Sequence, residues 1–474
     1  MRKWYFPVVV VFCFAFYSQT LSQQVQKHEL SFIEPYFPVP TKAQLNWQDA
    51  ELVMFLHFGM NTFTDKEWGD GTEDPKIFNP SKLNADQWVK VAKQNGFKYV
   101  ILTAKHHDGF CLWPSKFTSH SIKNSPYKNG KGDIVKEFAN ACRNNGVKFC
   151  FYLSPWDRHE KTYGTDEYNN YFTNQLTELL TNYGDVAEVW FDGANGEGPN
   201  GKTQNYNWDL YYSTIRRLQP DALIAVSGPD IRWIGNEDGL SNETEWCSQP
   251  KSFTLQHASE NGKVWYPSEC DVSIRPGWFY HSSQDQKIKS VDQLTDIYFK
   301  SVGMNSNLLL NVPPNKEGLI SDFDIQRLKE WRQNLDKLFA KDIFNGEQIE
   351  CSNVLNNSKE FSPKNCLDDN PKTFWTTDKN ITSAEINISL KHKKNINIIR
   401  LEEAIEYGQR IKSFEIYYDN DGCMEKIFEG TTIGRSRIIT FKKVITDRIK
   451  IIIKDSFASP TLRTIKGFYN ESGI

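Results

Sequence analysis

The sequence lacks the patterns that mark metal-binding, nucleic-acid-binding and membrane-spanning proteins. Its cysteines form no CxxC pair and its histidines form neither an HxH nor an HExxH pattern, so a zinc site has no sequence support. The net charge is −3 and no basic stripe is present, which argues against a nucleic-acid partner. No apolar run reaches the roughly 20 residues that a membrane span requires. Internal repeats and low-complexity linkers are absent as well.

The N-terminus has the features of a secretory signal. Arg2 and Lys3 precede a short apolar core at residues 7–16, and small residues then lead to a cleavage point near Ser22–Gln23. We therefore expect residues 1–22 to be a signal peptide and the chain to be exported to the periplasm or the extracellular space, with no membrane span after cleavage. A retained membrane anchor is the alternative.

Eight cysteines remain after this cleavage, and their spacing is scattered. Export permits disulfides, but a chain of this size does not need a disulfide framework to fold. Cys351 and Cys366 are close enough in sequence to form a local pair. The connectivity of the cysteines stays open.

From about residue 50 to 340, within a first domain expected at 23–342, short apolar segments alternate with amphipathic ones. The segments 52–58, 99–103, 148–153, 187–192, 223–226 and 307–312 are nearly continuously apolar, as in strands buried on both faces of a parallel sheet. Helical spacing occupies 84–95, 134–145, 167–182, 209–218 and 322–339. This alternation predicts an α/β fold with a (β/α)8-like TIM-type barrel as the catalytic domain.

Residues 346–474 have a different hydrophobic periodicity. The segments 386–390, 396–401, 413–418 and 438–442 are alternating or β-branched, and no helical pattern separates them. We therefore expect a C-terminal β-sandwich domain.

Polar side chains stand at the ends of five consecutive predicted barrel strands. Because the active sites of such barrels form at the carboxyl ends of the strands, these positions are candidates for catalysis. An isolated strand-end carboxylate is usually a helix cap or an ion-pair partner, whereas five occupied strand ends are harder to explain by structure alone. They are His57; His106, His107 and Asp108; Trp156 and Asp157; Asp192; and Arg232 with Glu237.

Two of these carboxylates, Asp192 and Glu237, suit glycoside hydrolysis. One would attack the anomeric carbon while the other protonates the leaving oxygen. Histidines and an arginine would bind the hydroxyls of one sugar. A metal site at His106-His107-Asp108 is the alternative, but adjacent histidines on a strand should point to opposite faces. We expect neither a metal nor a cofactor.

Several motifs resemble those of the α-L-fucosidases, glycoside hydrolase family 29. They run in the family's order through residues 50–315, and their combination is specific. They are His57-Phe58-Gly59, Glu67-Trp68-Gly69, Ala104-Lys105-His106-His107-Asp108-Gly109-Phe110, Tyr152-Leu153-Ser154-Pro155-Trp156, Trp190-Phe191-Asp192-Gly193 and Asn307-Leu308-Leu309-Leu310-Asn311-Val312.

The resemblance assigns roles to individual residues. Asp192 matches the family's nucleophile, and Glu237 resembles the acid/base of the branch selective for α-1,3/1,4-linked fucose, with Glu269 as its rival. Since the family is retaining, the two carboxyl groups should lie about 5–5.5 Å apart. The predicted sugar-binding positions are His57, Glu67, Trp68, His106, His107, Tyr152, Trp156, Arg232, Arg275 and Trp278. The two arginines could instead pair with neighbouring acids.

The branch implies a fucosylated oligosaccharide or glycoconjugate of the Lewis a or Lewis x type as substrate. A broad α-L-fucosidase that also cleaves α-1,2 links, or an inactive carbohydrate-binding barrel, are the alternatives. The segment Leu367-Asp368-Asp369-Asn370-Pro371 and the following residues to Trp375 resemble discoidin-like (factor 5/8 type C) sandwiches. Such modules often bind sugar or calcium, but packing against the barrel is the expected role here.

Overall fold

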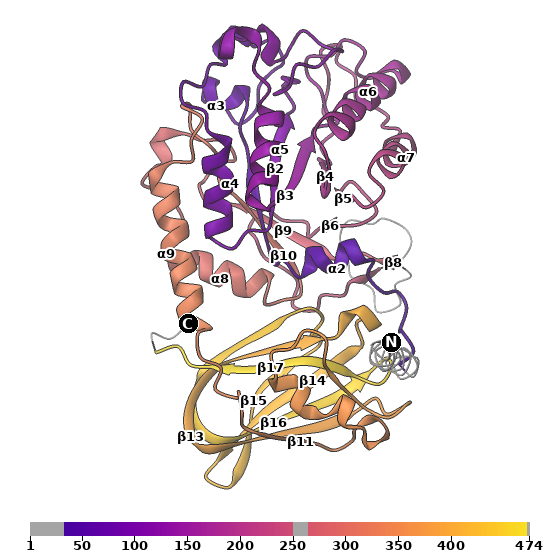
Figure 1. Ribbon diagram of the computed structural model, residues 1–474, viewed down its shortest axis with the longest axis vertical. Coiled ribbons are helices and arrows are strands. Elements are labelled where there is room, and N and C mark those ends of the chain that lie inside the picture. The colour runs from indigo at the N-terminus through magenta and orange to yellow at the C-terminus, as the bar shows by residue number, and fades with distance from the viewer. Residues whose placement is uncertain (1–32, 250–263, 472–474) are drawn as a thin grey trace, which may run out of the picture.

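The first domain is built around eight parallel strands, in a computed structural model that describes residues 33–249 and 264–471 (Figure 1). The strands are hydrogen-bonded in the order β5-β4-β3-β2-β1-β10-β9-β6, and a bridge between Ala225 and Ile231 brings the two ends of the sheet together. The barrel is therefore nearly closed. Its strands are β1 Leu52–Leu56, β2 Tyr99–Lys105, β3 Lys148–Leu153, β4 Glu188–Phe191, β5 Leu223–Val226, β6 Arg232–Trp233, β9 Ser268–Ser273 and β10 Asn307–Asn311.

Helices cover the outside of this barrel, and local sequence sets their ends. In α5, the Asp133 side chain accepts a hydrogen bond from the Lys136 N–H and caps the first turn, while Gly146 ends the helix at a φ of 68°. The helices of the domain are α2 Lys42–Gln48, α3 Met60–Thr64, α4 Ala85–Gln94, α5 Ile134–Asn145, α6 Asp166–Asn182, α7 Trp208–Leu218, α8 Val291–Ser301 and α9 Asp322–Leu338.

Alternate residues of each strand face the two sides of the barrel wall. On β4, Val189 and Phe191 pack with the helices, whereas Trp190 joins the inner cluster that also contains Phe55 and Tyr152. The period of two along a strand places Asp192 on the same inward face as Trp190, just past the strand's end. The inner side chains at the carboxyl ends of the strands therefore converge on one site.

The second domain is an antiparallel sheet that folds over a core of its own. Its strands pair in the order β12-β17-β13-β16-β14-β15, with β11 beside β13. The core is rich in isoleucine, including Ile386, Ile399 and Ile451. The strands are β11 Gln348–Cys351, β12 Trp375–Thr376, β13 Ala384–Glu403, β14 Ile411–Asn420, β15 Cys423–Gly430, β16 Arg437–Ser456 and β17 Thr461–Phe468.

The predicted fold class is confirmed, and several details differ. Segments 386–390 and 396–401 belong to one long strand, β13, whose register shifts between Ser389 and Lys394. A bulge of this kind bends a strand without ending it. The sequence prediction also missed the barrel strands β6 and β9. The eight cysteines in the described part of the chain are free thiols, Cys351 and Cys366 included.

The second domain contacts the barrel near the amino ends of its strands. The Ile438 N–H donates to the Gly303 carbonyl at 2.9 Å, and Arg400 pairs with Glu51, the residue directly before β1. In Figure 1 the barrel lies above this domain, with α2 and α8 adjoining it. The carboxyl ends of the strands are thus left open. In the two described stretches, no helix combines the length and apolar character that crossing a membrane requires.

Candidate active site

Asp192 stands at the carboxyl end of β4 with its carboxylate held from several sides. The Tyr152 hydroxyl donates to Oδ2 at 3.0 Å, and the Ala194 N–H donates to Oδ1 at 2.7 Å. Nε2 of His107 lies 3.8 Å from Oδ2. The side chain is 26% exposed, so it is oriented by its neighbours and still open to a ligand. An oriented, accessible carboxylate is suited to nucleophilic attack.

His57, His106 and His107 gather beside this carboxylate. The rings of His106 and His107 are 4.1 Å apart between centroids, and those of His57 and His106 are 5.8 Å apart. Burial lowers the pKa of His57 to about 3, and burial also lowers the pKa of His106 and His107. All three rings are therefore neutral near pH 7, and each has one donor and one acceptor nitrogen.

The expectation that His106 and His107 point to opposite faces is wrong. Both residues follow the last residue of β2, Lys105, so the alternation of a strand no longer applies. Within 33–249 and 264–471, no three His, Cys, Asp or Glu side chains are grouped so that they could hold a metal ion. The expected absence of a metal stays a prediction.

Hydrogen bonds fix which nitrogen of His57 carries the proton. Its Nδ1 lies 2.8 Å from Oδ1 of Asn311. The amide of Asn311 cannot be reversed, because its Nδ2 donates to the Trp278 carbonyl at 2.8 Å. Nδ1 of His57 is therefore the donor, and its Nε2 is left as an acceptor.

The same reasoning applies to His107. The Ser154 hydroxyl donates to the Trp156 carbonyl at 2.7 Å, so its oxygen accepts from Nδ1 of His107, also at 2.7 Å. Nε2 of His107, beside Asp192, is then an acceptor too. Two acceptor nitrogens of this kind can take hydrogen bonds from sugar hydroxyls. Asn311 and Ser154, which set the tautomers, were not predicted from sequence.

Aromatic rings enclose the histidines. Trp68 is 61% exposed and lies edge-on to His107 and to Trp156, at 6.1 and 5.9 Å between centroids. On the other side, the buried ring of Phe279 contacts His57 and His106 at 5.4 and 5.0 Å. Exposed aromatic faces suit the C–H surface of a sugar ring. Phe279 directly follows Trp278 in sequence, but it was not predicted as a site residue.

Glu67, the residue before Trp68, contacts the loop after β9. Its Oε2 accepts from the Trp278 N–H at 2.8 Å, and its Oε1 lies 2.6 Å from Nε2 of His281. Burial lowers the pKa of His281, but hydrogen bonds to Asp65 and Glu67 outweigh it and leave that pKa raised. Glu67 thus holds the Trp278 loop in place.

Glu237 lies at the mouth of the same site. Its side chain is exposed, and its Oε2 accepts from Nε1 of Trp278 at 3.1 Å. The Trp278 ring in turn lies 5.1 Å from the ring of His57. A chain of contacts therefore joins Glu237 to the histidine cluster, whose member His107 lies beside Asp192.

Glu269, the rival acid/base, lies elsewhere. It is the second residue of β9 and is only 1% exposed, inside the barrel rather than at its rim. Its Oε1 accepts from Nε1 of Trp190 at 2.9 Å. A group enclosed in the core has no access to a leaving oxygen, so its position does not fit an acid/base.

The two predicted sugar-binding arginines are also placed differently. Arg232 is buried and pairs with Glu245. The Arg275 Nε donates to both carboxylate oxygens of Asp324, at 2.9 and 3.0 Å, and its Nη1 donates to Asp285 at 2.8 Å. Both arginines are only 1% exposed, so we correct their role from binding sugar to buried ion pairing.

Asp157 is another strand-end acid with a structural role. It pairs with Lys105 at 2.9 Å, and both side chains are fully buried. Its Oδ1 accepts from the N–H groups of His159 and Glu160. Asp157 therefore holds the turn after β3 rather than facing the site.

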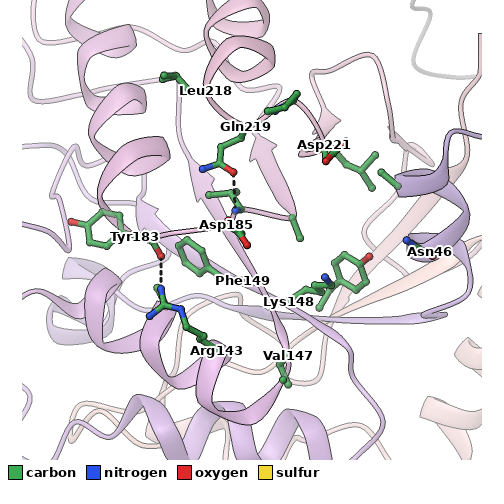
Figure 2. Close-up of a pocket in the computed structure, with 18 of the residues that line it drawn as sticks. Asn46, Arg143, Val147, Lys148, Phe149, Tyr183, Asp185, Leu218, Gln219 and Asp221 are labelled. Atoms are coloured by element: carbon green, nitrogen blue, oxygen red, sulfur yellow. Dashed lines mark hydrogen bonds between the residues drawn. The ribbon is translucent and has the colours of Figure 1, made fainter. Parts of the chain in front are cut away.

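The barrel also has a cavity of about 880 Å³ at the opposite end (Figure 2). It is lined by residues near the amino ends of β2 to β5, and in Figure 2 Arg143 donates to the Tyr183 carbonyl while Gln219 accepts from the N–H of Val186. None of the predicted site residues lines it. In barrels of this type that end contributes to stability rather than to catalysis.

Comparison with known proteins gives one consistent family. The profile described as Alpha-L-fucosidase matches residues 72–337, and the F5/8 type C domain profile matches residues 348–464. The chain is 42% identical to alpha-L-fucosidase 1 of Arabidopsis thaliana over 474 residues, covering 96% of this chain and 93% of that one.

Two solved structures agree with this. A glycoside hydrolase family 29 fucosidase of Ruminococcus gnavus in complex with fucose is 34% identical, with a TM-score of 0.86, over 92% of this chain and 96% of that chain. A family 29 member from an unknown rumen bacterium is 40% identical, with a TM-score of 0.82, over 92% of this chain and 78% of that chain.

Proposed function

Since the chain belongs to the α-L-fucosidase family of glycoside hydrolases, we propose that it releases terminal fucose from oligosaccharides or glycoconjugates by a retaining double displacement. The observation that carries the proposal is the Asp192 carboxylate, held by the Tyr152 hydroxyl and the Ala194 N–H at the centre of the site. An inactive barrel would have no need of such an oriented carboxylate.

In the first step, an oxygen of Asp192 attacks the anomeric carbon of the α-fucoside. The bond to the leaving oxygen breaks through an oxocarbenium-like transition state, and Glu237 gives that oxygen its proton. A β-fucosyl ester on Asp192 results. In the second step, Glu237 takes a proton from water, the water oxygen attacks the same carbon, and the ester bond breaks to release α-fucose.

The fucose would lie among the neutral histidines. The acceptor nitrogens of His57 and His107 would take hydrogen bonds from ring hydroxyls, and His106 would contribute a further contact. Trp68 and Trp156 would pack against the sugar's apolar face. Because the rings are neutral, they add no positive charge that would bind Asp192 and weaken it as a nucleophile.

Replacement of Asp192 tests the proposal. Asp192→Ala should lower turnover of an aryl fucoside at least about a thousandfold, because the covalent intermediate can no longer form. Fucose binding, measured by calorimetry, should persist. Asp185→Ala, an exposed acid at the other end of the barrel, is the matched control and should keep full activity. Near-normal turnover by Asp192→Ala would refute the assignment.

For the linkage, we propose a preference for α-1,3- and α-1,4-linked fucose of the Lewis a and Lewis x type. The support is Glu237, whose sequence context resembles that branch and whose carboxylate lies at the mouth of the site with Trp278. Turnover of a Lewis trisaccharide should exceed that of 2′-fucosyllactose. Equal rates would favour the broad α-L-fucosidase that also cleaves α-1,2 links.

We also propose that the chain is exported after removal of residues 1–22, which lie outside the described residues. The support is the basic start and short apolar core of the N-terminal sequence. Mass spectrometry of the protein from its native host should find a mature chain that begins at Gln23 in the periplasm or the medium. An intact N-terminus on a membrane-bound chain would favour the retained anchor.

A further inference from the structure

Two glutamates inside the barrel core have no part in the proposed reaction. Glu188 of β4 is fully buried and its Oε2 accepts from Nε1 of Trp47 at 3.1 Å. Glu269 of β9 accepts from Nε1 of Trp190 in the same way, at 2.9 Å. The second oxygen of each carboxyl group has no hydrogen-bond partner in the described part of the chain. Two acids at the centre of an aromatic core need an explanation.

These two acids hold protons at neutral pH. Burial raises the pKa of Glu188 to about 8. Burial also raises the pKa of Glu269 well above its usual range, and the neighbouring Glu188 raises it further. In the neutral form each carboxyl group still offers an oxygen to its indole N–H, without placing a negative charge beneath the site.

The indole that Glu269 holds forms the floor of the active site. The Trp190 ring stacks on Tyr152 with centroids 5.3 Å apart and planes at 30°, and it lies 5.2 Å from Phe55. The hydroxyl of Tyr152 donates to Asp192. Trp190 and Asp192 are also two residues apart on the same face of one strand. The orientation of the Trp190 indole therefore affects the orientation of the Asp192 carboxylate, both through the backbone and through Tyr152.

We propose that Glu269 is a positioning residue for the nucleophile. Its carboxyl oxygen anchors the Trp190 indole, which supports Tyr152, which in turn orients the attacking oxygen of Asp192. The proposal rests on the assigned role of Asp192. It gives Glu269 a part in the displacement step without contact to the substrate.

Two substitutions separate this role from that of an acid/base. Glu269→Gln keeps a neutral acceptor for the indole, whereas Glu269→Leu removes the acceptor at similar volume. We expect Glu269→Leu to lower kcat about tenfold to a hundredfold with little change in KM, because small displacements of reacting groups have effects of that size. Glu269→Gln should stay within about threefold of the wild type.

The comparison of two substrates sharpens the test. A positioning residue should affect an aryl fucoside with a good leaving group and a fucosylated trisaccharide by the same factor. An acid/base would affect the trisaccharide far more, and azide would restore the activity of its variant on the aryl fucoside. That pattern in Glu269→Leu would overturn the proposal, and so would equal losses in the Gln and Leu variants.

Trp190→Phe covers the case in which Glu269→Leu does not fold. It keeps a stacking ring and removes the N–H donor. Its loss should match that of Glu269→Leu, and combining it with Glu269→Gln should add nothing; additive losses would overturn the proposal. All variants are compared with the wild type, whose own failure to cleave any fucoside would refute the proposed function instead.

Discussion

His57, His106 and His107 are residues that usually titrate near neutral pH, and burial removes that behaviour here. With the pKa of His57 lowered to about 3 and that of His106 lowered well below its usual range, these two rings stay neutral through the range in which an exposed histidine would change charge, and burial lowers the pKa of His107 as well. The tautomers of His57 and His107 are set by Asn311 and Ser154. Each of these two rings thus acts as a fixed donor and acceptor pair, which is what selection of one sugar's hydroxyl pattern requires.

Replacement of Glu237 is the single substitution that most directly tests the proposed mechanism. Glu237→Ala should lower turnover of a natural oligosaccharide about a hundredfold to ten-thousandfold, the usual effect of losing a general acid. An aryl fucoside with a good leaving group should still form the ester on Asp192, and azide should then release it. Two inversions give α-fucosyl azide, which NMR identifies.

Asp238→Ala is the control for Glu237→Ala. Asp238 is the neighbouring exposed acid and should be replaceable without loss. Failure of azide to accelerate Glu237→Ala, or formation of β-fucosyl azide, would contradict the assignment of Glu237.

The loop after β9 is the element that joins both sides of the site. Its Trp278 donates its main-chain N–H to Glu67 and its indole N–H to Glu237. Its carbonyl receives the Asn311 amide that sets the tautomer of His57. Trp278 therefore contacts Glu67, the proposed acid/base Glu237 and, through Asn311, the histidine cluster.

Gly277 lets this loop approach Glu67, so we expect its replacement by alanine to lower activity. A Cβ at residue 277 would lie 2.3 Å from Oε1 of Glu67, so Gly277→Ala must displace that side chain. The displaced carboxylate would lose its hydrogen bond to the Trp278 N–H. Since a hydrogen bond to a charged group contributes about 1.5–3 kcal/mol, kcat/KM should fall about tenfold to a hundredfold.

Stability should respond less than activity in Gly277→Ala, because the clash is with the movable end of a side chain. Gly346→Ala provides the contrast. Gly346 has a φ of 72° with open space around it, so the added methyl should cost stability through backbone strain and leave kcat/KM unchanged. Thermal unfolding and kinetics of both variants decide the point. Full activity in Gly277→Ala would show that the Glu67 contact is dispensable.

Sequence reasoning found the elements whose residues are apolar and missed those that are polar. The segment 99–103 was identifiable because a run of apolar residues marks a strand buried on both faces. β9, Ser268–Ser273, contains Ser268, Glu269, Asp271 and Ser273, and nothing in such a run distinguishes a barrel strand from a loop. Only the ring of neighbouring strands and the indoles that pair with its acids explain why it is buried.

The site was predictable where a motif marks it and not where distant chain segments meet. Asp192 and the three histidines follow strands in recognisable strings. Asn311 and Ser154 lie inside quoted motifs, but their roles, like that of Phe279, depend on contacts between distant chain segments that the motifs do not give. The sequence left the role of Arg232 open between sugar binding and ion pairing, because an arginine after a strand has the same appearance whether it faces a ligand or a buried acid such as Glu245.

At the scale of the whole molecule, a cluster of charged side chains, most of them largely shielded from solvent, joins the two domains. Arg400 of the second domain pairs with Glu51 of the barrel and with Glu402, and Arg435 contacts Glu402 and Asp49. Burial alone would raise the pKa of Glu402, but Arg435 and Arg400 outweigh it and lower that pKa to about 2. Because these contacts lie on the side of the barrel opposite to Asp192, the interface is expected to affect stability rather than chemistry.

Arg400→Met tests this division between stability and catalysis. Removal of the guanidinium leaves the carboxylate of Glu51, whose side chain is 21% exposed, with fewer partners. Breaking a fully buried pair in this way costs about 3–5 kcal/mol. We expect the lower end of that range, since Tyr298 still donates to Glu51 at 2.8 Å. Urea unfolding measures the loss, and kcat/KM of the folded variant should match the wild type. Lys82→Met, which breaks the exposed pair with Glu317, should change stability by about 0–1 kcal/mol.

Acid should remove the same stabilisation in the wild type. The pKa of Glu402 is about 2 in the folded chain and near 4.5 in the unfolded chain, so the unfolded state binds a proton first as the pH falls. The contribution of Glu402 is therefore complete above about pH 4.5 and is lost as the pH falls toward 2. In Arg400→Met the pKa of Glu402 should rise, and the free energy of unfolding should depend less steeply on pH between about 5 and 2. An identical pH dependence in both proteins would mean that this cluster of charged side chains does not hold the domains together through charge.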